Sequence, residues 1–413
     1  MAQYQPATRR TINKHWVTKM FADTHFSVLL VLMVAVAGPL LAELPVGFRI
    51  PAVVLEVVLG VVIGPQVLGL VHFDGIVASM FAFGMAATLF MAGMELEFER
   101  IRGRPLWLAV GGWGISVALG LLAAAVLHAS SLHDPMIVAL ALATTSLVTL
   151  LPILRDADQL DTPFGRLFIA AGTMGELGPI VAMSLLLSQQ YTTLQEFGFL
   201  MVFLVVVVLA AAISLGLRPP RVLALLGRSM HASSQLPVRA TLLLFAAFFV
   251  LSERFGFESI LGAFAAGMVV GLATQGAEGK APRMKIDAIF FGWFIPFFFV
   301  GTGIKFDLWS VTGSALTMLL VPISLALFLL VRGAPVFLYR SDLTAAERTS
   351  FALYSSVASL SLVVVITEIG VRAKTMSPQM ASVLVSAAVL SLLLFPTIAG
   401  QLLRQRHNRL ERH

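Results

Sequence analysis

Long runs of apolar residues, separated by short polar segments, recur along almost the whole chain. A helix of about 20 such residues crosses the ~30 Å hydrocarbon core of a bilayer. The pattern therefore predicts an all-α polytopic membrane protein with about 13 transmembrane helices. The predicted spans, numbered one to thirteen, are 26–44, 51–71, 76–96, 105–128, 135–154, 165–189, 195–217, 235–252, 257–273, 286–304, 312–339, 346–369 and 376–402.

The composition agrees with this pattern and excludes several other classes of protein. Hydrophobic residues make up 58% of the 413 and charged residues 12%, whereas soluble proteins carry about 25% charged residues. The chain has no cysteine, and its eight histidines do not pair at helical spacing, so we expect no disulfide framework and no metal centre. No nucleophile stands with a paired histidine, so we predict neither an enzyme nor a cofactor.

The net charge of +6 comes from basic residues that cluster in short loops between the apolar runs. This is the distribution of a membrane protein and argues against binding to nucleic acid. The loops after odd-numbered spans hold most of the arginine and lysine, so the positive-inside rule places them in the cytoplasm with the basic tail 403–413. The N-terminal tail 1–25 would then lie outside, although its own basic residues favour the opposite side. We expect the protein in the cell membrane, with a bacterial plasma membrane as the setting.

The two halves of the chain resemble each other. Gly93 near the end of span three aligns with Gly303 of span ten at an offset of 210, and Ala141 of span five aligns with Ala352 of span twelve at 211. The loop assignment makes the two copies inverted, which is typical of secondary transporters with a site at the midplane. Chance similarity between apolar segments is the alternative. The transmembrane domain, 26–402, is divided into repeat one at 26–189, a linking helix at 195–217 and repeat two at 235–402.

Three ionisable residues are predicted inside spans: Glu56, Glu176 and Arg332. A charged group at a helix centre costs roughly 2.5–3.5 kcal/mol, so such a residue indicates function by default. Burial favours the protonated form of Glu176, and its carboxylate can hold either a proton or a cation but not both. The alternative for Glu176 is a permanently protonated side chain that is hydrogen-bonded between helices.

Arg332 stays charged at any accessible pH, and we predict that it balances charge near the site. The alternative is that its side chain snorkels toward the inner surface. Glu56 either binds Arg332 or supports close helix packing around Gly60 and Gly64.

Hydroxyl groups in the middle of two spans are further candidates. They belong to Thr144, Thr145 and Ser146 of span five and to Ser355 and Ser356 of span twelve. In a continuous helix such hydroxyls often bond only to their own backbone. If these spans are broken, the hydroxyls and the freed carbonyls would line a cation site.

Five segments, in order along almost the whole chain, resemble the Kef-type branch of the monovalent cation:proton antiporters. They are 59–70, 89–96, Thr145 with Ser146, Gly165 and Arg166 followed by an acid at Glu176, and 298–308. The resemblance implies that spans five and twelve are crossed, interrupted helices that meet beside Glu176, with Arg332 opposite. It also implies a homodimer with a dimerisation scaffold and a mobile core that moves like an elevator.

The chain departs from the family pattern in two places. The family usually has aspartate at the acidic position, preceded by aspartate, asparagine or glutamine, whereas this chain has Gly175 and Glu176. Span twelve also lacks the glycines that the family usually has at its break. These departures bear on stoichiometry and selectivity, and on whether span twelve unwinds.

The sequence thus predicts a secondary active transporter that exchanges a monovalent cation, Na⁺ or K⁺, for protons. Glu176 is the shared site for the cation and the proton, and a single acid beside a fixed arginine predicts electroneutral exchange. The accessory ligands would be the hydroxyls of Thr144, Thr145, Ser146, Ser355 and Ser356. Two alternatives remain: a gated cation channel on the same scaffold, and a transporter of organic anions that uses Arg332 and half-helix N-termini.

Overall fold

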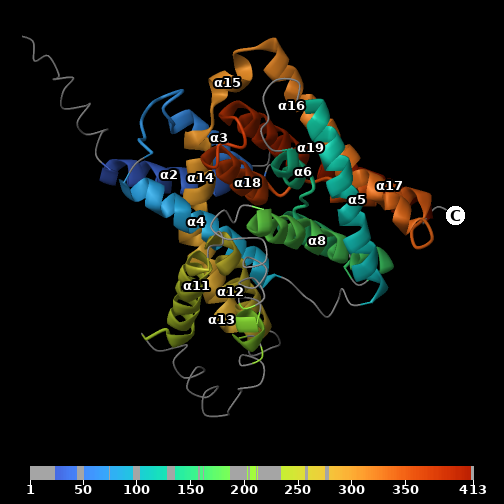
Figure 1. Cartoon of the computed structure of the whole chain (residues 1–413), viewed down its shortest axis with the longest axis horizontal. Coiled ribbons are helices and arrows are strands. Elements are labelled where there is room, and N and C mark those ends of the chain that lie inside the picture. Colours follow the sequence, from blue (N-terminus) through green and yellow to red (C-terminus); the bar gives the residue numbers. More distant parts are fainter. Residues whose placement is uncertain are drawn as a thin grey trace, which may run out of the picture. The chain divides into compact units, whose positions relative to one another are not determined.

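The computed structural model is built of helices (Figure 1). It describes residues 24–43, 51–73, 75–95, 103–127, 135–156, 159–160, 162–186, 202, 205–210, 212, 234–255, 259–274 and 279–410. No strand occurs among these residues, and the predicted all-α fold is confirmed.

Every predicted span except the seventh coincides with a described helix or with a broken pair of helices. Span seven lies mostly, and the tail 1–25 almost entirely, outside the described residues. By length and composition, seven described helices and the bent pair α17–α18 can cross a membrane. The elements are α2 (Thr24–Ala42), α3 (Ala52–Ile63), α4 (Gly75–Met94), α5 (Arg104–Leu127), α6 (Pro135–Leu142), α7 (Leu147–Asp156), α8 (Pro163–Leu186), α11 (Leu236–Arg254), α12 (Ser259–Ala273), α13 (Lys280–Ile289), the π-helical turn η2 (Phe290–Phe294), α14 (Ile295–Lys305), α15 (Leu308–Thr312), α16 (Ala315–Gly333), the 3-10 helix η3 (Ala334–Tyr339), α17 (Ala345–Ser355), α18 (Leu360–Arg372) and α19 (Pro378–Leu410).

The helices form two compact units. The first contains the described residues up to Gly84 together with Pro296–Phe306, and the second contains the others. In the first unit α2, α3, the start of α4 and most of α14 enclose an apolar core. Its members include Val31, Ile63, Val77, Phe297 and Val300.

Within the first unit, α3 and α14 pack backbone against backbone. A methyl group on Gly60 would lie 3.1 Å from Cα of Gly303 and would overlap the carbonyl oxygen of Val300. The spacing of Gly60 and Gly64 therefore serves close packing, as one of the two interpretations of this region predicts. At the end of α14, the ammonium of Lys305 lies 5.2 Å from the ring centroids of both Phe73 and Phe81.

Span two is shorter than predicted because α3 ends at Ile63. Proline disfavours the helical conformation in the residue before it, and Gly64, which precedes Pro65, has an extended backbone with φ −68° and ψ 172°. The chain then turns back, so that the N–H of Leu70 donates to the carbonyl of Ile63.

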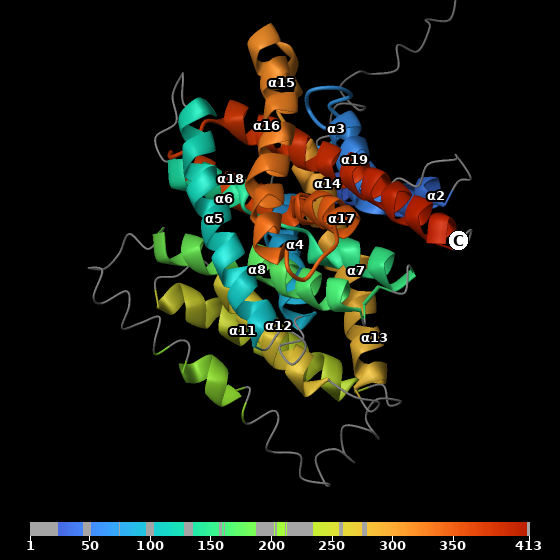
Figure 2. The same cartoon turned by 90° about the vertical axis from the view of Figure 1, so that its right-hand side faces the viewer.

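In the second unit α5 packs against α6, α8 and α16, while α19 packs against α16, α17 and α18 (Figures 1 and 2). Small residues again permit close approach, since a methyl group on Gly267 of α12 would overlap the carbonyl oxygen of Phe90 of α4. Aromatic side chains fill the space between α8 and α17, where the ring centroids of Phe168 and Phe351 are 5.7 Å apart. This packing holds α8 and α17 at the place where the candidate site is built.

Several helix ends differ from the predicted bounds for local reasons. α17 begins at a capping box, in which the Thr344 hydroxyl accepts from the Glu347 N–H and the Glu347 carboxylate accepts from the Thr344 N–H. α16 tightens into η3 at Pro335, because proline lacks the N–H that an α-helix needs. α13 extends the predicted span ten back to Lys280, and α19 extends span thirteen on to Leu410, so most of the predicted tail 403–413 is helical.

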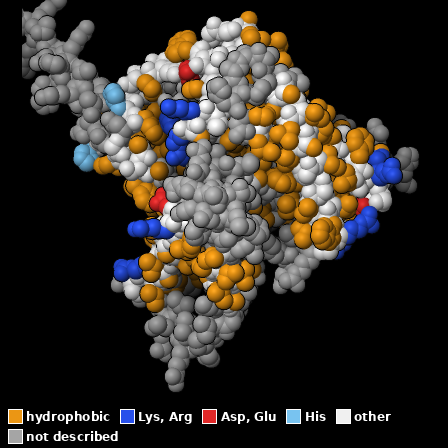
Figure 3. All heavy atoms as spheres, in the orientation of Figure 1, with side chains coloured by type: hydrophobic (Ala, Val, Ile, Leu, Met, Phe, Trp, Pro, Cys, Tyr) orange, Lys and Arg blue, Asp and Glu red, His pale blue; other side chains and the backbone are white. Residues whose placement is uncertain are grey.

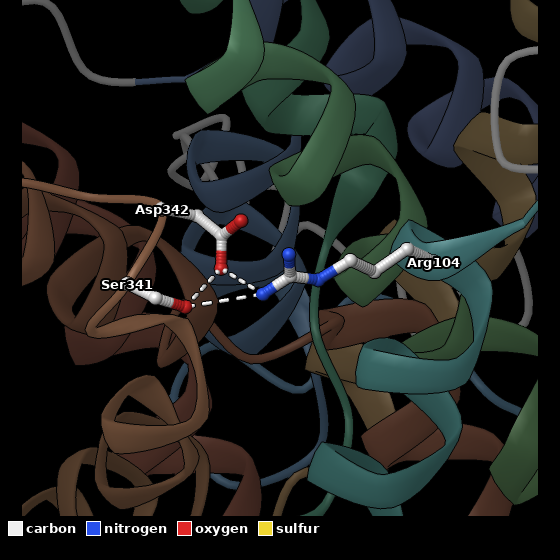
Figure 4. Close-up of polar contacts among 3 residues, drawn as sticks. All are labelled: Arg104, Ser341 and Asp342. Carbon is white, nitrogen blue, oxygen red and sulfur yellow. Dashed lines mark hydrogen bonds and ion pairs between the residues drawn. The ribbon is translucent and has the colours of Figure 1, made fainter.

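On the face shown in Figure 3, hydrophobic side chains cover much of the described surface, and the Lys and Arg side chains lie in a few groups. Trp107, Leu243 and Phe337 are each at least 70% exposed, as suits a surface that faces lipid. At the ends of α5 and η3 one ion pair joins Arg104 to Asp342, with an Nη2–Oδ2 distance of 2.9 Å. Ser341 accepts from the same nitrogen at 3.1 Å (Figure 4).

Candidate functional site

Spans five and twelve are both broken, and the two breaks bond to each other. Span five stops at Leu142 and resumes at Leu147, and span twelve stops at Ser355 and resumes at Leu360 with a bend of 43°. The offset of 211 carries the first break, 143–146, onto 354–357, which is within two residues of the observed 356–359. The crossed, interrupted helices are confirmed.

Two hydrogen bonds join the breaks directly. The Ser146 N–H donates to the carbonyl oxygen of Val357 at 2.8 Å, and the Thr145 hydroxyl donates to the carbonyl oxygen of Ser355 at 2.5 Å. An unwound backbone in the membrane needs such partners, because each unsatisfied group would cost several kcal/mol. The breaks therefore stabilise each other, and neither needs a glycine to unwind.

Glu176 lies on α8 beside the first break and is 2% exposed. Its Oε1 accepts from the N–H of Leu147 at 2.9 Å, and Leu147 is the first residue of α7. The N–H groups at a helix N-terminus lack intrahelical partners and carry partial positive charge, which favours a carboxylate there. One residue earlier, the carbonyl of Gly175 accepts from the Thr145 N–H at 3.2 Å.

Arg332 of α16 is 4% exposed and donates to three neutral oxygens from different elements. Its Nε donates to Thr145 Oγ1 at 2.7 Å, its Nη1 to Ser116 Oγ at 3.2 Å, and its Nη2 to the carbonyl oxygen of Ala171 at 3.1 Å. The snorkelling alternative is wrong for this residue, since the guanidinium is buried between α5, α8 and the first break. Arg332 thus contacts the crossing itself.

Gly175 has a steric reason for departing from the family pattern. A methyl group on this residue would lie 2.7 Å from Thr145 Cβ and 2.9 Å from Arg332 Nη2. The space that a larger side chain would occupy is therefore filled by the threonine and the arginine.

The remaining predicted hydroxyls differ in their partners. Thr144 donates to the carbonyl of Ala141 in the preceding half-helix α6 at 2.9 Å. Ser356 donates to the carbonyl of Ala352 in α17 at 2.7 Å and, at 3.4 Å, to the carbonyl of Leu329 in α16. Ser146 shares a 2.8 Å hydrogen bond with Thr149. Ser355 is 2% exposed, and its Oγ has no hydrogen-bond partner among the described residues.

Glu56 belongs to the first unit, on α3, and is buried. Its Cγ would lie 2.9 Å from a methyl group on Gly38 of α2, so it packs in the contact between these two helices. Its predicted pairing with Arg332, which belongs to the second unit, stays a prediction.

Three groups of this site were not among the predicted residues. Ser116 is buried on α5; its hydroxyl donates a hydrogen bond to the carbonyl of Val331 at 2.9 Å and accepts one from Arg332. Ser116 could have been found from the sequence, because it is a hydroxyl residue in the middle of a predicted span, like the candidates of span five. The N–H of Leu147 and the carbonyl of Ala171 are backbone groups and carry no such signal.

A solved structure shares this fold. A structure of the sodium proton antiporter MjNhaP1 from Methanocaldococcus jannaschii superposes with a TM-score of 0.62 and 17% sequence identity, covering 91% of this chain and 97% of that one. At this identity the likeness supports the fold alone.

Two bacterial relatives are similar in sequence. The putative Na⁺/H⁺ antiporter YjbQ of Bacillus subtilis is 25% identical over 397 residues, which are 90% of this chain and 62% of that protein. The Na⁺/H⁺-K⁺ antiporter GerN of Bacillus cereus is 27% identical over 289 residues, which are 68% of this chain and 72% of that protein. The chain thus spans less than two thirds of the length of the Bacillus subtilis relative.

The pattern of the family described as sodium/hydrogen exchanger, transmembrane, matches residues 23–405, which include every helix of the candidate site. The predicted kinship with monovalent cation:proton antiporters is thereby confirmed at the level of this family, and so is a multi-pass protein of the cell membrane. The chain belongs to the transmembrane sodium/hydrogen exchanger family.

Proposed function

We propose that this protein exchanges a monovalent cation, Na⁺ or K⁺, for protons, and that both compete for the carboxylate of Glu176. The observation that carries the proposal is the position of this carboxylate, which is buried at the crossing of two broken helices and bonded to the first N–H of α7. Family membership and the names of the relatives support the same class of activity.

Two opposing effects act on the Glu176 carboxylate. Burial favours its neutral, protonated form, because the charged form loses its hydration. The N–H of Leu147 and the N-terminus of α7 favour the charged form, which is also the form that binds a cation. Opposing effects of this kind leave both forms accessible, as exchange requires.

We propose electroneutral one-for-one exchange. Of the residues that the sequence predicts at the crossing, Glu176 is the one with a carboxyl group. Arg332 keeps its positive charge throughout the cycle. One cation would then replace one proton on a single carboxylate, and the charge of the site would be equal in both loaded states. The accompanying motion would be elevator-like alternating access in a homodimer, both of which remain predictions from the family resemblance.

The test replaces Glu176 by glutamine, which keeps the shape of the side chain but can neither ionise nor be protonated. The protein is reconstituted into liposomes that contain a pH-sensitive dye, and proton movement is followed after addition of Na⁺ or K⁺. We expect E176Q to fall to the rate of protein-free liposomes, while a matched control at an exposed acid on α11, E253Q, keeps the wild-type rate. An E176Q rate equal to that of wild type would exclude Glu176 as the shared site.

The same liposomes separate the alternative functions. Cation flux without counter-movement of protons would indicate a channel, and flux of a carboxylate would indicate an organic-anion transporter. Exchange that accelerates strongly under an imposed voltage would exclude electroneutral stoichiometry.

A further inference from the structure

The hydroxyl groups at the crossing are not equivalent, and their partners assign them different roles. Thr144 and Ser356 donate to backbone carbonyls, Ser356 to one in α17 and one in α16, and Ser146 pairs with Thr149. Thr145 bridges Arg332 and the carbonyl of Ser355. This leaves Ser355, whose buried Oγ has no hydrogen-bond partner among the described residues.

Thr145 is a poor ligand for a cation in this arrangement. A hydroxyl has one proton to donate and two lone pairs. The proton of Thr145 is directed to the Ser355 carbonyl, and one lone pair accepts from the charged guanidinium of Arg332 at 2.7 Å. A cation on the remaining lone pair would sit beside this fixed positive charge, which repels it.

Ser355 has the opposite surroundings. It is the last residue of α17, a half-helix whose C-terminal carbonyls carry partial negative charge and attract cations. Its backbone is held by Thr145, whose N–H in turn bonds to the residue before Glu176. A buried hydroxyl without a partner costs about 1–3 kcal/mol, and a bound cation would offset this cost by taking its oxygen as a ligand.

We propose that Ser355 supplies a hydroxyl ligand to the cation bound at Glu176, and that Thr145 is a positioning residue which holds the two broken helices together. This inference rests on the proposed function and deepens it, because it assigns cation binding to Ser355 and a structural role to Thr145. The second repeat then contributes directly to cation binding, and the first repeat contributes the carboxylate.

Binding is measured without transport, as the release of protons when Na⁺ or K⁺ is added to the purified protein in detergent at a fixed pH. We expect S355A to raise the half-saturating cation concentration by about tenfold, which corresponds to about 1.4 kcal/mol. The matched control is S382A, a buried serine of α19 whose hydroxyl donates to the carbonyl of Pro378 in its own helix at 3.1 Å, and it should stay within about twofold of wild type. S355C replaces the oxygen by a larger and softer sulfur atom without emptying the space, and it should raise the same concentration, so the role of Ser355 can be tested even if S355A does not fold.

Thr145 is tested by separating affinity from rate. We expect T145V to keep the half-saturating concentration and the preference among Li⁺, Na⁺ and K⁺, but to lower the maximal exchange rate and the melting temperature. T145S retains the hydroxyl and should restore both. A T145V variant with altered cation preference, or an S355A variant that binds like S382A, would overturn the proposal.

The failure of this inference is distinguishable from the failure of the proposed function. If E176Q abolishes cation-induced proton release while S355A and S355C bind like wild type, only the role of Ser355 is wrong. If E176Q still releases protons on cation addition, the shared site itself is wrong and this inference falls with it.

Discussion

Replacing Arg332 by lysine separates the charge of this residue from its hydrogen-bonding geometry. If Arg332 acts only by balancing charge, lysine should serve nearly as well, because both side chains are cationic. If it acts by joining three elements, lysine should fail, since an ammonium group is a compact point charge and lacks the planar fork of the guanidinium. The contacts to Thr145, Ser116 and Ala171 favour the second outcome.

The magnitude follows from the three bonds. A hydrogen bond from a charged donor contributes about 1.5–3 kcal/mol, and a lysine that reaches one of the three oxygens loses two such bonds, or about 3–6 kcal/mol. With an unfolding entropy of about 2.1 cal/mol/K per residue, as in globular proteins, 413 residues give about 0.9 kcal/mol/K. The melting temperature should therefore fall by about 3–7 °C.

The assay is the apparent melting temperature of the purified variant in detergent, combined with its exchange rate in liposomes. R340K is the matched control, because Arg340 lies eight residues further along and is exposed. We expect R332K to lose both stability and exchange, and R340K to retain both. An R332K protein that melts and exchanges like wild type would show that the hydrogen bonds of Arg332 do not hold the three elements together. Charge balance would then be the function of Arg332.

Two further predictions concern packing and surface charge. G60A should lower stability by about 1–3 kcal/mol, because its methyl group would overlap the Val300 carbonyl. G114A, with nothing within 4 Å of the added atom, should leave stability unchanged or raise it by up to about 1 kcal/mol, and equal melting temperatures for the two variants would contradict the packing argument. For the exposed pair Arg104–Asp342, a double-mutant cycle of R104Q and D342N should give a coupling energy below about 1 kcal/mol. This coupling should vanish in 1 M salt, where the Debye length is about 3 Å, and persistence there would indicate a stronger role for the pair.

The spans and the acid could be predicted from the sequence because each rests on a property of single residues. Apolar runs long enough to cross a bilayer, and a glutamate stranded inside one, are visible without knowledge of tertiary contacts. The same holds for Arg332, which the charge-balancing interpretation places near the buried site. Helix ends were less predictable, since α3 already stops at Ile63, two residues before Pro65, and α13 runs through a basic segment that was expected to be a loop.

The family resemblance implied the break in span twelve, but the residues of the span do not predict it, because its cause lies in another part of the chain. No glycine or proline marks residues 356–359, and a local interpretation favours a continuous helix there. The break persists because Val357 and Ser355 give their carbonyls to Ser146 and Thr145, some 210 residues away in sequence. Contacts of this range enter only with the tertiary fold.

The absence of a side chain at Gly175 makes room for the contact between Arg332 and Thr145. From the sequence it is an absent ligand, since relatives of this type usually carry a polar or acidic residue at that position. In the structure a methyl group there would already press against Thr145 and Arg332, so glycine is what lets the arginine reach the threonine. The same absence leaves Glu176 as the acid of this pair of positions, which is the premise of one-for-one exchange. The contact between Arg332 and Thr145 and the proposed stoichiometry therefore depend on one residue. A G175N variant should weaken that contact while adding a polar oxygen next to the carboxylate.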